Sequence, residues 1–374
     1  MNIEIKRVET NSDLHRFIRF QHWLYKDNPY WCPPLRFDEF NTLSRKKNAA
    51  FEYCEAEYWL AYRDGKLAGR VAGIINSRAN EYWKEPLVRF GWIDFIEDFE
   101  VAEALIRTVE EWGKSKGMQG IQGPLGFTDL DREGMLVEGF QERSTFSSLY
   151  NYPYYPQYIE RMGFQKATDW LQMEFTIPKE IPDKVIRTSK LVTEKYNIRV
   201  LKVKKSKELI PWAPKLFRMM NDAFLVLYGF APISEKQMED YTKQYFGFVR
   251  PEFVCIIVDS KDDVLGFGVS MPSLTSALQK CNGKIFPFGF YHILKAIRKN
   301  KIIDMYLLGI RPDYQKKGIL SLIYESLHKA YLKNGVELAL TNPQLEENFN
   351  ALTVWKNYPG RQNVRRRCFI KHWN

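Results

Sequence analysis

A short basic turn combines the residue types that bind phosphate. Its sequence, Gln-Lys-Lys-Gly, covers residues 315–318, after an apolar run from Ile302 to Ile310 and before an amphipathic stretch that continues to Tyr331. Amide N–H groups at the start of a helix are free to bind anions, and Gly318 allows a ligand to approach the backbone closely. The turn therefore predicts a ligand that carries phosphate groups.

The segments on either side of the turn predict the elements that position it. The apolar run is typical of a strand buried on both faces. Behind the turn, apolar residues recur with helical spacing at Ile319, Leu322, Ile323, Leu327, Ala330 and Tyr331. Asn334 and Gly335 indicate the end of this helix. An ordinary strand–turn–helix unit with a solvated basic turn is the alternative interpretation.

The sequence contains an internal repeat. Two strand–turn–strand patterns are centred on Gly69 and Gly266, which are 197 residues apart (266 − 69). The same offset separates Asn151 from Asn348 (348 − 151), and each asparagine precedes a glycine by 12 residues (163 − 151 and 360 − 348). Such a repeat is typical of a duplicated structural unit.

Both copies have the same predicted order of elements: strand, helix, hairpin, parallel strand, helix, strand, short helix and final strand. We therefore expect an α/β protein with a mixed sheet, built as two tandem domains at residues 1–178 and 197–374. Residues 179–196 are charged and compatible with a helix, which is typical of a connector. Because the apolar edges of tandem copies can pack together, we expect one rigid body.

The two copies differ at the position of the basic turn. In the first copy, four carboxylates lie among residues 94–100, ahead of the central helix. Carboxylates at a helix N-terminus satisfy its N–H groups and repel a phosphate. We therefore expect the second copy to hold the ligand and the first to shape the substrate side.

The second copy opens with a predicted strand at residues 198–203 and a helix from Lys207.

The arrangement of strand, Gln-x-x-Gly turn and helix resembles the acyl-coenzyme A site of the GNAT superfamily. That signature is Gln/Arg-x-x-Gly-x-Gly/Ala; Gln315 and Gly318 match it, and Leu320 stands where Gly or Ala is usual. The order of elements in both copies also resembles the GNAT fold, so the resemblance covers essentially the whole chain. Tandem architectures of this kind resemble N-myristoyltransferase and the FemABX aminoacyl transferases.

The resemblance implies an acyl-CoA-dependent N-acyltransferase that moves an acyl group, expected to be acetyl, from acetyl-CoA or another acyl-CoA to a primary amine. It implies that the pantetheine arm runs beside Leu308, Gly309 and Ile310. Gly309 marks either a bulge or close packing against a helix. The pyrophosphate is expected on the turn formed by Gln315, Lys316, Lys317, Gly318, Ile319 and Leu320.

The proton donor to the departing thiolate is less clearly marked. The GNAT fold often places a tyrosine there, and the corresponding position in this chain is Trp355. Tyr358, one helical turn further on, is the candidate catalytic acid, with a partly buried structural aromatic as the alternative. Asn348 either orients the substrate or caps the helix, and capping is the expected role.

Two long insertions distinguish the copies. Residues 272–301 include an aromatic and basic helix, which is a structural cover, a substrate lid or a membrane-surface contact. Residues 125–150 carry an acidic set that either attracts a cationic amine or forms a solvated face. The acidic residues are Asp129, Asp131, Glu133, Glu138 and Glu142.

The amino-acid composition limits the classes of protein to which the chain can belong. A chain of 374 residues with 45% hydrophobic and 27% charged residues fits a globular protein with two cores. The absence of a long apolar stretch and of a signal peptide predicts a cytoplasmic protein. Five cysteines and five histidines lack ligand spacing, so no metal site or disulfide framework is expected. The net charge of +10 is spread out, so a nucleic-acid partner is not expected.

Two other functions fit the same sequence. Leu320 and Trp355 favour a non-catalytic CoA-binding or interaction module. The FemABX resemblance favours aminoacyl transfer from charged tRNA. The fold alone does not choose the acceptor.

Overall fold

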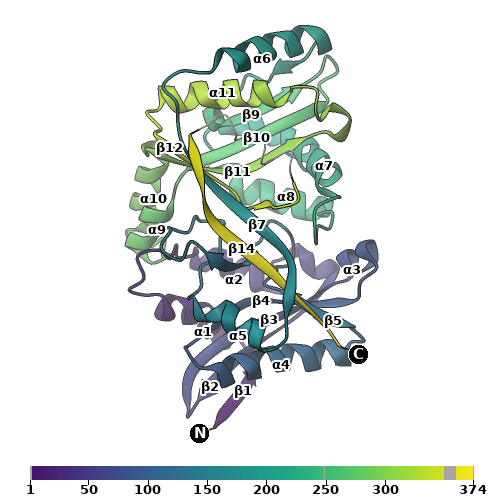
Figure 1. The fold of residues 1–374 in the computed structure, drawn as a ribbon. Coiled ribbons are helices and arrows are strands. Elements are labelled where there is room, and N and C mark those ends of the chain that lie inside the picture. The colour runs from purple at the N-terminus through teal and green to yellow at the C-terminus, as the bar shows by residue number, and fades with distance from the viewer. Residues whose placement is uncertain (1, 248, 349–358, 374) are drawn as a thin grey trace.

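One continuous mixed sheet runs through both halves of the protein. The computed structural model describes residues 2–247, 249–348 and 359–373. Within them, the strand order is β1-β2-β3-β4-β5-β14-β7-β12-β11-β10-β9-β8. Figure 1 shows the N-terminal half at one end of the molecule and the C-terminal half at the other. The α/β class with a mixed sheet is confirmed.

The first half contains the predicted elements in their predicted order, and it has three additional short helices and one additional short strand. Its elements are β1 (Ile3–Arg7), α1 (Asn11–Leu24), α2 (Arg36–Leu43), η1 (Ala49–Glu52), β2 (Cys54–Arg63), β3 (Lys66–Asn76), α3 (Ser77–Trp83), β4 (Leu87–Phe95), α4 (Phe99–Ser115), β5 (Gly120–Gly123), β6 (Met135–Glu138), α5 (Tyr154–Arg161) and β7 (Gln165–Thr176).

The second half begins with a helix from the predicted connector. Its elements are α6 (Asp183–Tyr196), β8 (Arg199–Val200), η2 (Ser206–Trp212), α7 (Ala213–Phe224), α8 (Glu235–Tyr245), η3 (Pro251–Phe253), β9 (Val254–Val258), β10 (Val264–Pro272), α9 (Thr275–Cys281), α10 (Gly289–Arg298), β11 (Ile302–Ile310), η4 (Pro312–Tyr314), α11 (Leu320–Lys333), β12 (Leu338–Thr341), β13 (Gln344–Leu345) and β14 (Gly360–His372).

The predicted repeat is present in the pairing of the strands. β2 and β3 form an antiparallel hairpin, as do β9 and β10. β4 runs parallel to β5 and β11 parallel to β12, and the helices between them, α4 and α11, pack on the sheet. Every apolar position predicted for the helix after the basic turn is buried.

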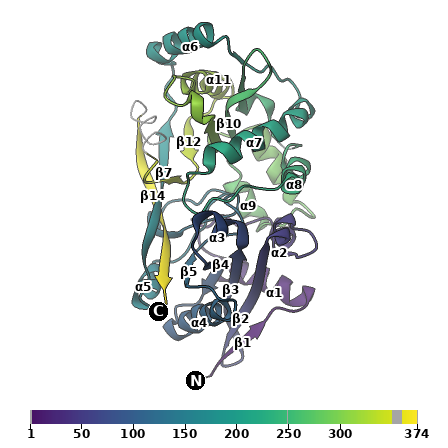
Figure 2. The ribbon, with the colours of Figure 1, turned by 90° about the vertical axis from the view of Figure 1, so that its right-hand side faces the viewer.

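The last strand of each half pairs with the other half. β14, from the second half, lies between β5 and β7, and β7, from the first half, pairs with β12. Figures 1 and 2 show β7 and β14 running side by side across the middle of the molecule. The sheet thus crosses the domain limits inferred from the sequence, and those limits stay a prediction.

The start of the second half differs from its prediction. Only Arg199 and Val200 of the predicted strand 198–203 pair with β9. The helix expected from Lys207 is a 3₁₀ segment, η2, and the α-helix begins at Ala213. Pro211 explains the shift, because proline inside an α-helix removes a hydrogen bond and clashes with the preceding turn. No helix in the described part of the chain is long and apolar enough to span a membrane.

Candidate functional site

A gap opens between β11 and β12 beside the basic turn. The two strands are paired from Ile302 to Met305, and β11 then continues to Ile310 without a partner on that side among the described residues. β12 ends at Thr341, and the chain turns away to form β13, which pairs with β7. The backbone from Tyr306 to Ile310 is therefore available for an extended ligand to pair with, as an added strand would.

A bulge lies where the gap begins, and it is not at the predicted glycine. The register between β10 and β11 shifts between Val269 and Ser270, which leaves Tyr306 as the extra residue of β11. Gly309 is instead a close-packing position, because an added Cβ would lie 2.8 Å from Cε1 of Phe267. The close contact is with a side chain of β10 and not with a helix.

The basic turn exposes several free amides. Lys316 and Gly318 both have positive φ angles, 59° and 83°. Within the described residues, the N–H groups of Lys316, Gly318 and Ile319 make no backbone hydrogen bond. The side chains of Gln315, Lys316 and Lys317 are exposed. The N–H of Lys317 donates to the carbonyl of Tyr314. Free amides near cationic side chains suit phosphate groups.

The connector helix packs against this turn. α6 contacts α11, and an added Cβ on Gly318 would lie 3.0 Å from Cγ2 of Val192 on α6. Leu320 and Val185 of α6 both pack against the buried pair of Phe175 and Tyr324. The side chain of Leu320 therefore occupies the apolar layer beneath α6, which explains why a bulky residue is accommodated at the position where GNAT signatures have Gly or Ala.

Two cavities meet next to the gap. The smaller, about 190 Å³, is lined by β11 residues from Met305 to Leu308 and by Tyr324 of α11. The larger, about 440 Å³, lies between the two halves and is called the chamber below. Its walls are mostly apolar and include Leu35, Phe146, Leu216, Phe217, Phe267 and Ile293.

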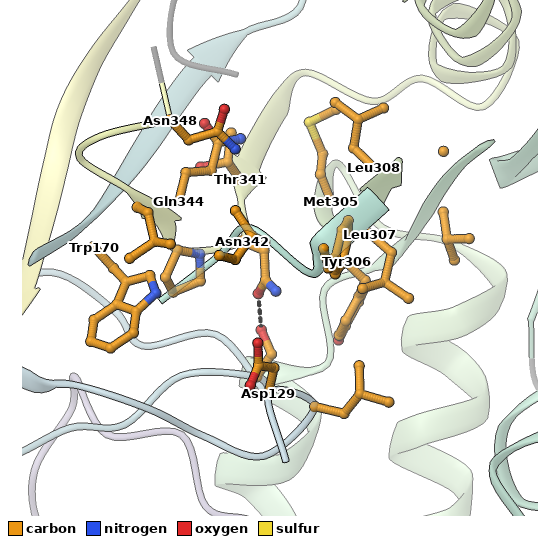
Figure 3. Close-up of a pocket in the computed structure, with 18 of the residues that line it drawn as sticks. Asp129, Trp170, Met305, Tyr306, Leu307, Leu308, Thr341, Asn342, Gln344 and Asn348 are labelled. Atoms are coloured by element: carbon orange, nitrogen blue, oxygen red, sulfur yellow. Dashed lines mark hydrogen bonds between the residues drawn. The ribbon is translucent and has the colours of Figure 1, made fainter. Parts of the chain in front are cut away.

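Carboxylates from the first half stand at the junction of the two cavities. Asp129 and Asp131 line both cavities, and Glu133 lines the smaller one; these three residues are called the acid trio below. In Figure 3, Asp129 lies near Asn342, with Tyr306 on the other side of the same space. The acidic insertion is thus not simply a solvated face, although Glu138 is exposed as expected for one.

The acid trio is held by a closed loop. The N–H of Gly134 donates to the carbonyl of Pro124, and the N–H of Thr128 donates to Oδ2 of Asp131 over 3.0 Å. Gly126 is required there, since an added Cβ would lie 2.2 Å from Cβ of Asp131. These contacts fix the backbone on which Asp129 is presented.

Burial raises the pKa of every member of the acid trio. Loss of solvation raises the pKa of Asp129 to about 7, against the opposing charge of Arg89. Desolvation also raises the pKa of Asp131 to about 7. The pKa of Glu133 is raised well above its ordinary value, first by burial and then by the charge of Asp129. With a pKa of about 7, Asp129 is partly ionised at neutral pH.

Polar groups from both halves complete the junction. Ser147 Oγ donates to Oδ1 of Asn342 over 2.6 Å, and the N–H of Asn342 donates to the carbonyl of Met305. The buried guanidinium of Arg89 donates Nη1 to the carbonyl of Gly126 over 3.1 Å. Among the described residues, no group of His, Cys, Asp and Glu side chains is arranged to hold a metal ion.

The residues predicted to bind the acyl donor lie close together in the structure. Other polar residues near them belong to no motif that the sequence showed. Leu308 lines the smaller cavity, and the turn from Gln315 to Leu320 lies at the end of the same strand. Tyr358 lies outside the described residues. Asn348 lines the smaller cavity. The segment that it was expected to cap lies outside the described residues, so that role stays a prediction. Tyr306, Ser147 and Asn342 were missed; only the position of Asn342 directly after a strand could have pointed to it.

In the first half, carboxylates cap the helix that corresponds to α11. Asp98 caps α4 by accepting from the N–H groups of Glu100 and Val101 over 3.0 and 3.3 Å. Arg63 forms ion pairs with Asp98 and Glu100. The helix N-terminus is therefore satisfied internally.

Comparison with curated proteins finds two similar chains of comparable length. Protein YghO of Escherichia coli strain K12 is 27% identical over 355 residues, which cover 92% of this chain and 89% of that protein. The bacterial ceramide synthase of Caulobacter vibrioides is 24% identical over 318 residues, which cover 84% of this chain and 82% of that protein. No family model matches the chain.

Comparison with solved structures identifies the fold. A tandem GNAT protein from the clavulanic acid biosynthesis pathway matches with a TM-score of 0.55 and 10% identity, covering 99% of this chain and 98% of that one. A GCN5-related N-acetyltransferase from Sphaerobacter thermophilus matches with a TM-score of 0.52 and 12% identity, covering 99% and 95%. The chain therefore has the tandem GNAT fold, which confirms the resemblance inferred from the basic turn and the repeat.

Proposed function

We propose that this protein is an N-acyltransferase that moves an acyl group from coenzyme A to the amine of a long-chain acceptor. The observation that carries the proposal is the meeting of two cavities at the acid trio. One cavity follows the unpaired edge of β11, and the other is an apolar chamber between the halves. A donor and an acceptor that enter from opposite sides would meet beside Asp129.

The donor fits the gap beside β11. A pantetheine arm has amide groups that pair with a free strand edge, and its pyrophosphate suits the free amides of Lys316, Gly318 and Ile319. The thioester would then lie in the smaller cavity, between Leu308 and the acid trio. An N–H of the unpaired β11 edge would stabilise the negative charge on the thioester oxygen.

The acceptor fits the chamber. Apolar walls suit a hydrocarbon tail, and carboxylates at one end suit a cationic amine. The Caulobacter protein is named a ceramide synthase, and a ceramide is an amide between a fatty acid and a long-chain amino alcohol. A long-chain amine is therefore the acceptor class that both the chamber and this relative support.

The chemistry uses the raised pKa values of the acid trio. The ionised form of Asp129 takes a proton from the ammonium group, and the neutral amine attacks the thioester carbon. The attacking nitrogen loses its second proton as the tetrahedral intermediate collapses, and the CoA thiolate gains a proton as it leaves. Glu133, whose pKa is raised by burial, lines the cavity in which this thiolate would form; it can donate a proton to the thiolate and accept the second proton of the nitrogen. Tyr358 remains a second candidate for that role.

The experiment combines purified protein, a long-chain acyl-CoA and a panel of amines that runs from short amines to long-chain amino alcohols. Thiol release and the mass of the amide are measured. We expect both signals with long-chain amines and at least tenfold lower kcat/KM with short ones. CoA binding without thiol release would favour the non-catalytic module, and binding of charged tRNA without CoA would favour aminoacyl transfer.

A glycine substitution tests the donor site separately. Gly318→Ala is expected to weaken CoA binding at least tenfold, because alanine disfavours a φ of +83° and its Cβ would press on Val192. Calorimetry with CoA measures the dissociation constant. Gly335→Ala is the matched control, since Gly335 has a φ of +66° but open space around it. Equal effects of the two substitutions on CoA affinity would show that the turn does not bind the cofactor.

A further inference from the structure

The helical insertion between β10 and β11 has one exposed face of unusual composition. Phe286 and Phe288 are 77% and 73% exposed, and Phe290, Tyr291 and Leu294 continue this apolar surface along α10. The five residues are called the aromatic face below. Large aromatic side chains seldom gather in contact with water without a partner, so this surface calls for one.

The loop before α10 holds the aromatic face in place. An added Cβ on Gly289 would lie 1.7 Å from the carbonyl oxygen of Lys284, so the backbone doubles back tightly there. The N–H of Phe290 donates to the carbonyl of Ile285 over 2.9 Å. These contacts fix the stretch that carries Phe286 and Phe288, and the two side chains project from it into solvent.

All charged side chains on the insertion itself are positive. The sequence has no acidic residue from 264 to 303. Lys301, at the end of the insertion, pairs with Glu337. Five further exposed basic side chains lie on the insertion, and within the described residues none of them forms an ion pair. They are Lys280, Lys284, Lys295, Arg298 and Lys299. Positive charge beside exposed aromatic rings complements a bilayer surface that contains anionic lipids.

The opposite side of the insertion faces the chamber. Ile293 and Ile297 of α10, and Ile285 in the loop before it, line the chamber. α9 anchors the insertion to the first half, because Gln279 Nε2 donates to the carbonyl of Trp31 over 3.0 Å and Thr275 Oγ1 donates to the carbonyl of Ser144. One helix, roughly 10 Å across, thus separates the aromatic face from the apolar chamber.

We propose that the aromatic face and its basic neighbours dock the protein on the surface of a bilayer with anionic headgroups. The rings enter the boundary between headgroups and acyl chains, and the lysines and arginine contact the headgroups. The docking proposal depends only on this surface. We also propose that docking lets a long-chain amine pass from the bilayer into the chamber beside α10, and this second step rests on the proposed function.

The test is co-sedimentation of the full-length protein with vesicles of phosphatidylcholine, with and without about 30% phosphatidylglycerol. We expect at least tenfold tighter binding to the anionic vesicles and weaker binding as salt rises. The double variants Phe286→Ser/Phe288→Ser and Lys295→Glu/Arg298→Glu are each expected to lower binding at least tenfold. None of these four residues lines either cavity.

A matched control comes from α6, which also exposes apolar side chains near lysines. Ile186→Ser/Leu191→Ser changes residues that are 42% and 65% exposed, and we expect it to leave vesicle binding unchanged. Hydrogen exchange of the unaltered protein should show protection of residues 284–299 when anionic vesicles are added. Absence of that protection, or an equal loss of binding in the α6 variant, would overturn the proposal. Vesicle binding without acyl transfer would refute the proposed function and leave docking intact.

Discussion

Asp129→Asn is expected to lower kcat/KM for amide formation by about 10²- to 10⁴-fold, the usual contribution of a general base. Asparagine keeps the size and polarity of the side chain but cannot accept the proton of the ammonium group. The turn from Gln315 to Leu320 is unchanged, so the dissociation constant for CoA should stay as it is. Thiol release at varied amine concentration measures the first quantity, and calorimetry measures the second.

The pH dependence of the unaltered protein provides an independent check of the same role. Burial raises the pKa of Asp129 to about 7. The ionised form that accepts a proton is therefore scarce below pH 7 and predominates above it. We expect kcat/KM to rise tenfold per pH unit in the acidic range and to level off above about pH 7. A carboxylate with an ordinary pKa would already be ionised at pH 5, so a flat profile from pH 5 to 8 would contradict this assignment.

An exposed carboxylate from the same insertion serves as the control. Glu138 is exposed and pairs with Arg365, so Glu138→Gln should leave kcat/KM within about twofold of the unaltered value. The Asp129→Asn protein should also be at least as stable at pH 8. The pKa of Asp129 is raised from 3.8 to about 7 in the folded state. Its ionisation therefore lowers the free energy of unfolding as pH rises between these two values, and the loss is complete above about pH 7. Asparagine removes this destabilisation. A loss of thermal stability would mean that Asp129 has a structural role.

Local features of the fold were predictable from the sequence because they depend on neighbouring residues. The helix from Leu320 to Lys333 follows from the spacing of its apolar residues, and its end follows from Gly335, whose φ is +66°. The basic turn depends on one glycine and on the elements next to it. Such patterns are set within a few turns of chain, where periodicity and capping operate.

The environment of the acid trio was not predictable in the same way. In the sequence, Asp129 and Glu138 look alike, as acids on one long insertion. The structure separates them because the second half packs over one part of that insertion, and Tyr241 of α8 lies beside Thr128 there. Burial by residues more than a hundred positions away leaves no local signal. The chamber was missed for the same reason.

The pairing of the final strands also could not be predicted from the sequence. β7 and β14 are equivalent strands of the repeat, and either could complete the sheet of its own half. The choice depends on contacts formed only in the assembled protein. Asp169 of β7, 1% exposed in its side chain, accepts from Arg365 over 2.9 Å and from Arg367 over 2.8 Å, both on β14. These ion pairs fasten the two strands to each other across the centre of the sheet.

Residues 1–178 and 179–374, produced as separate fragments, are therefore each expected to fail to fold, whereas co-expression should restore a soluble complex. Without β14, the first fragment loses the strand between β5 and β7, and Asp169 keeps Lys166 but loses Arg365 and Arg367. A total stability of roughly 5–15 kcal/mol is small against the loss of hydrogen bonds and packing on both sides of a central strand. Circular dichroism and size-exclusion chromatography of the single and combined fragments measure the outcome.

The location of the cut decides what this experiment means. A second pair of fragments, divided between Asp259 and Asp263 in the turn from β9 to β10, breaks the second half internally and also separates β7 from β14. If strand pairing across the halves dominates stability, both pairs of fragments should depend on each other for folding. If residues 179–374 alone gave a cooperative thermal transition, the second half would be independent of β7. The junction of the two cavities would then depend on a docking contact, and not on a shared sheet, to hold the acid trio against β11.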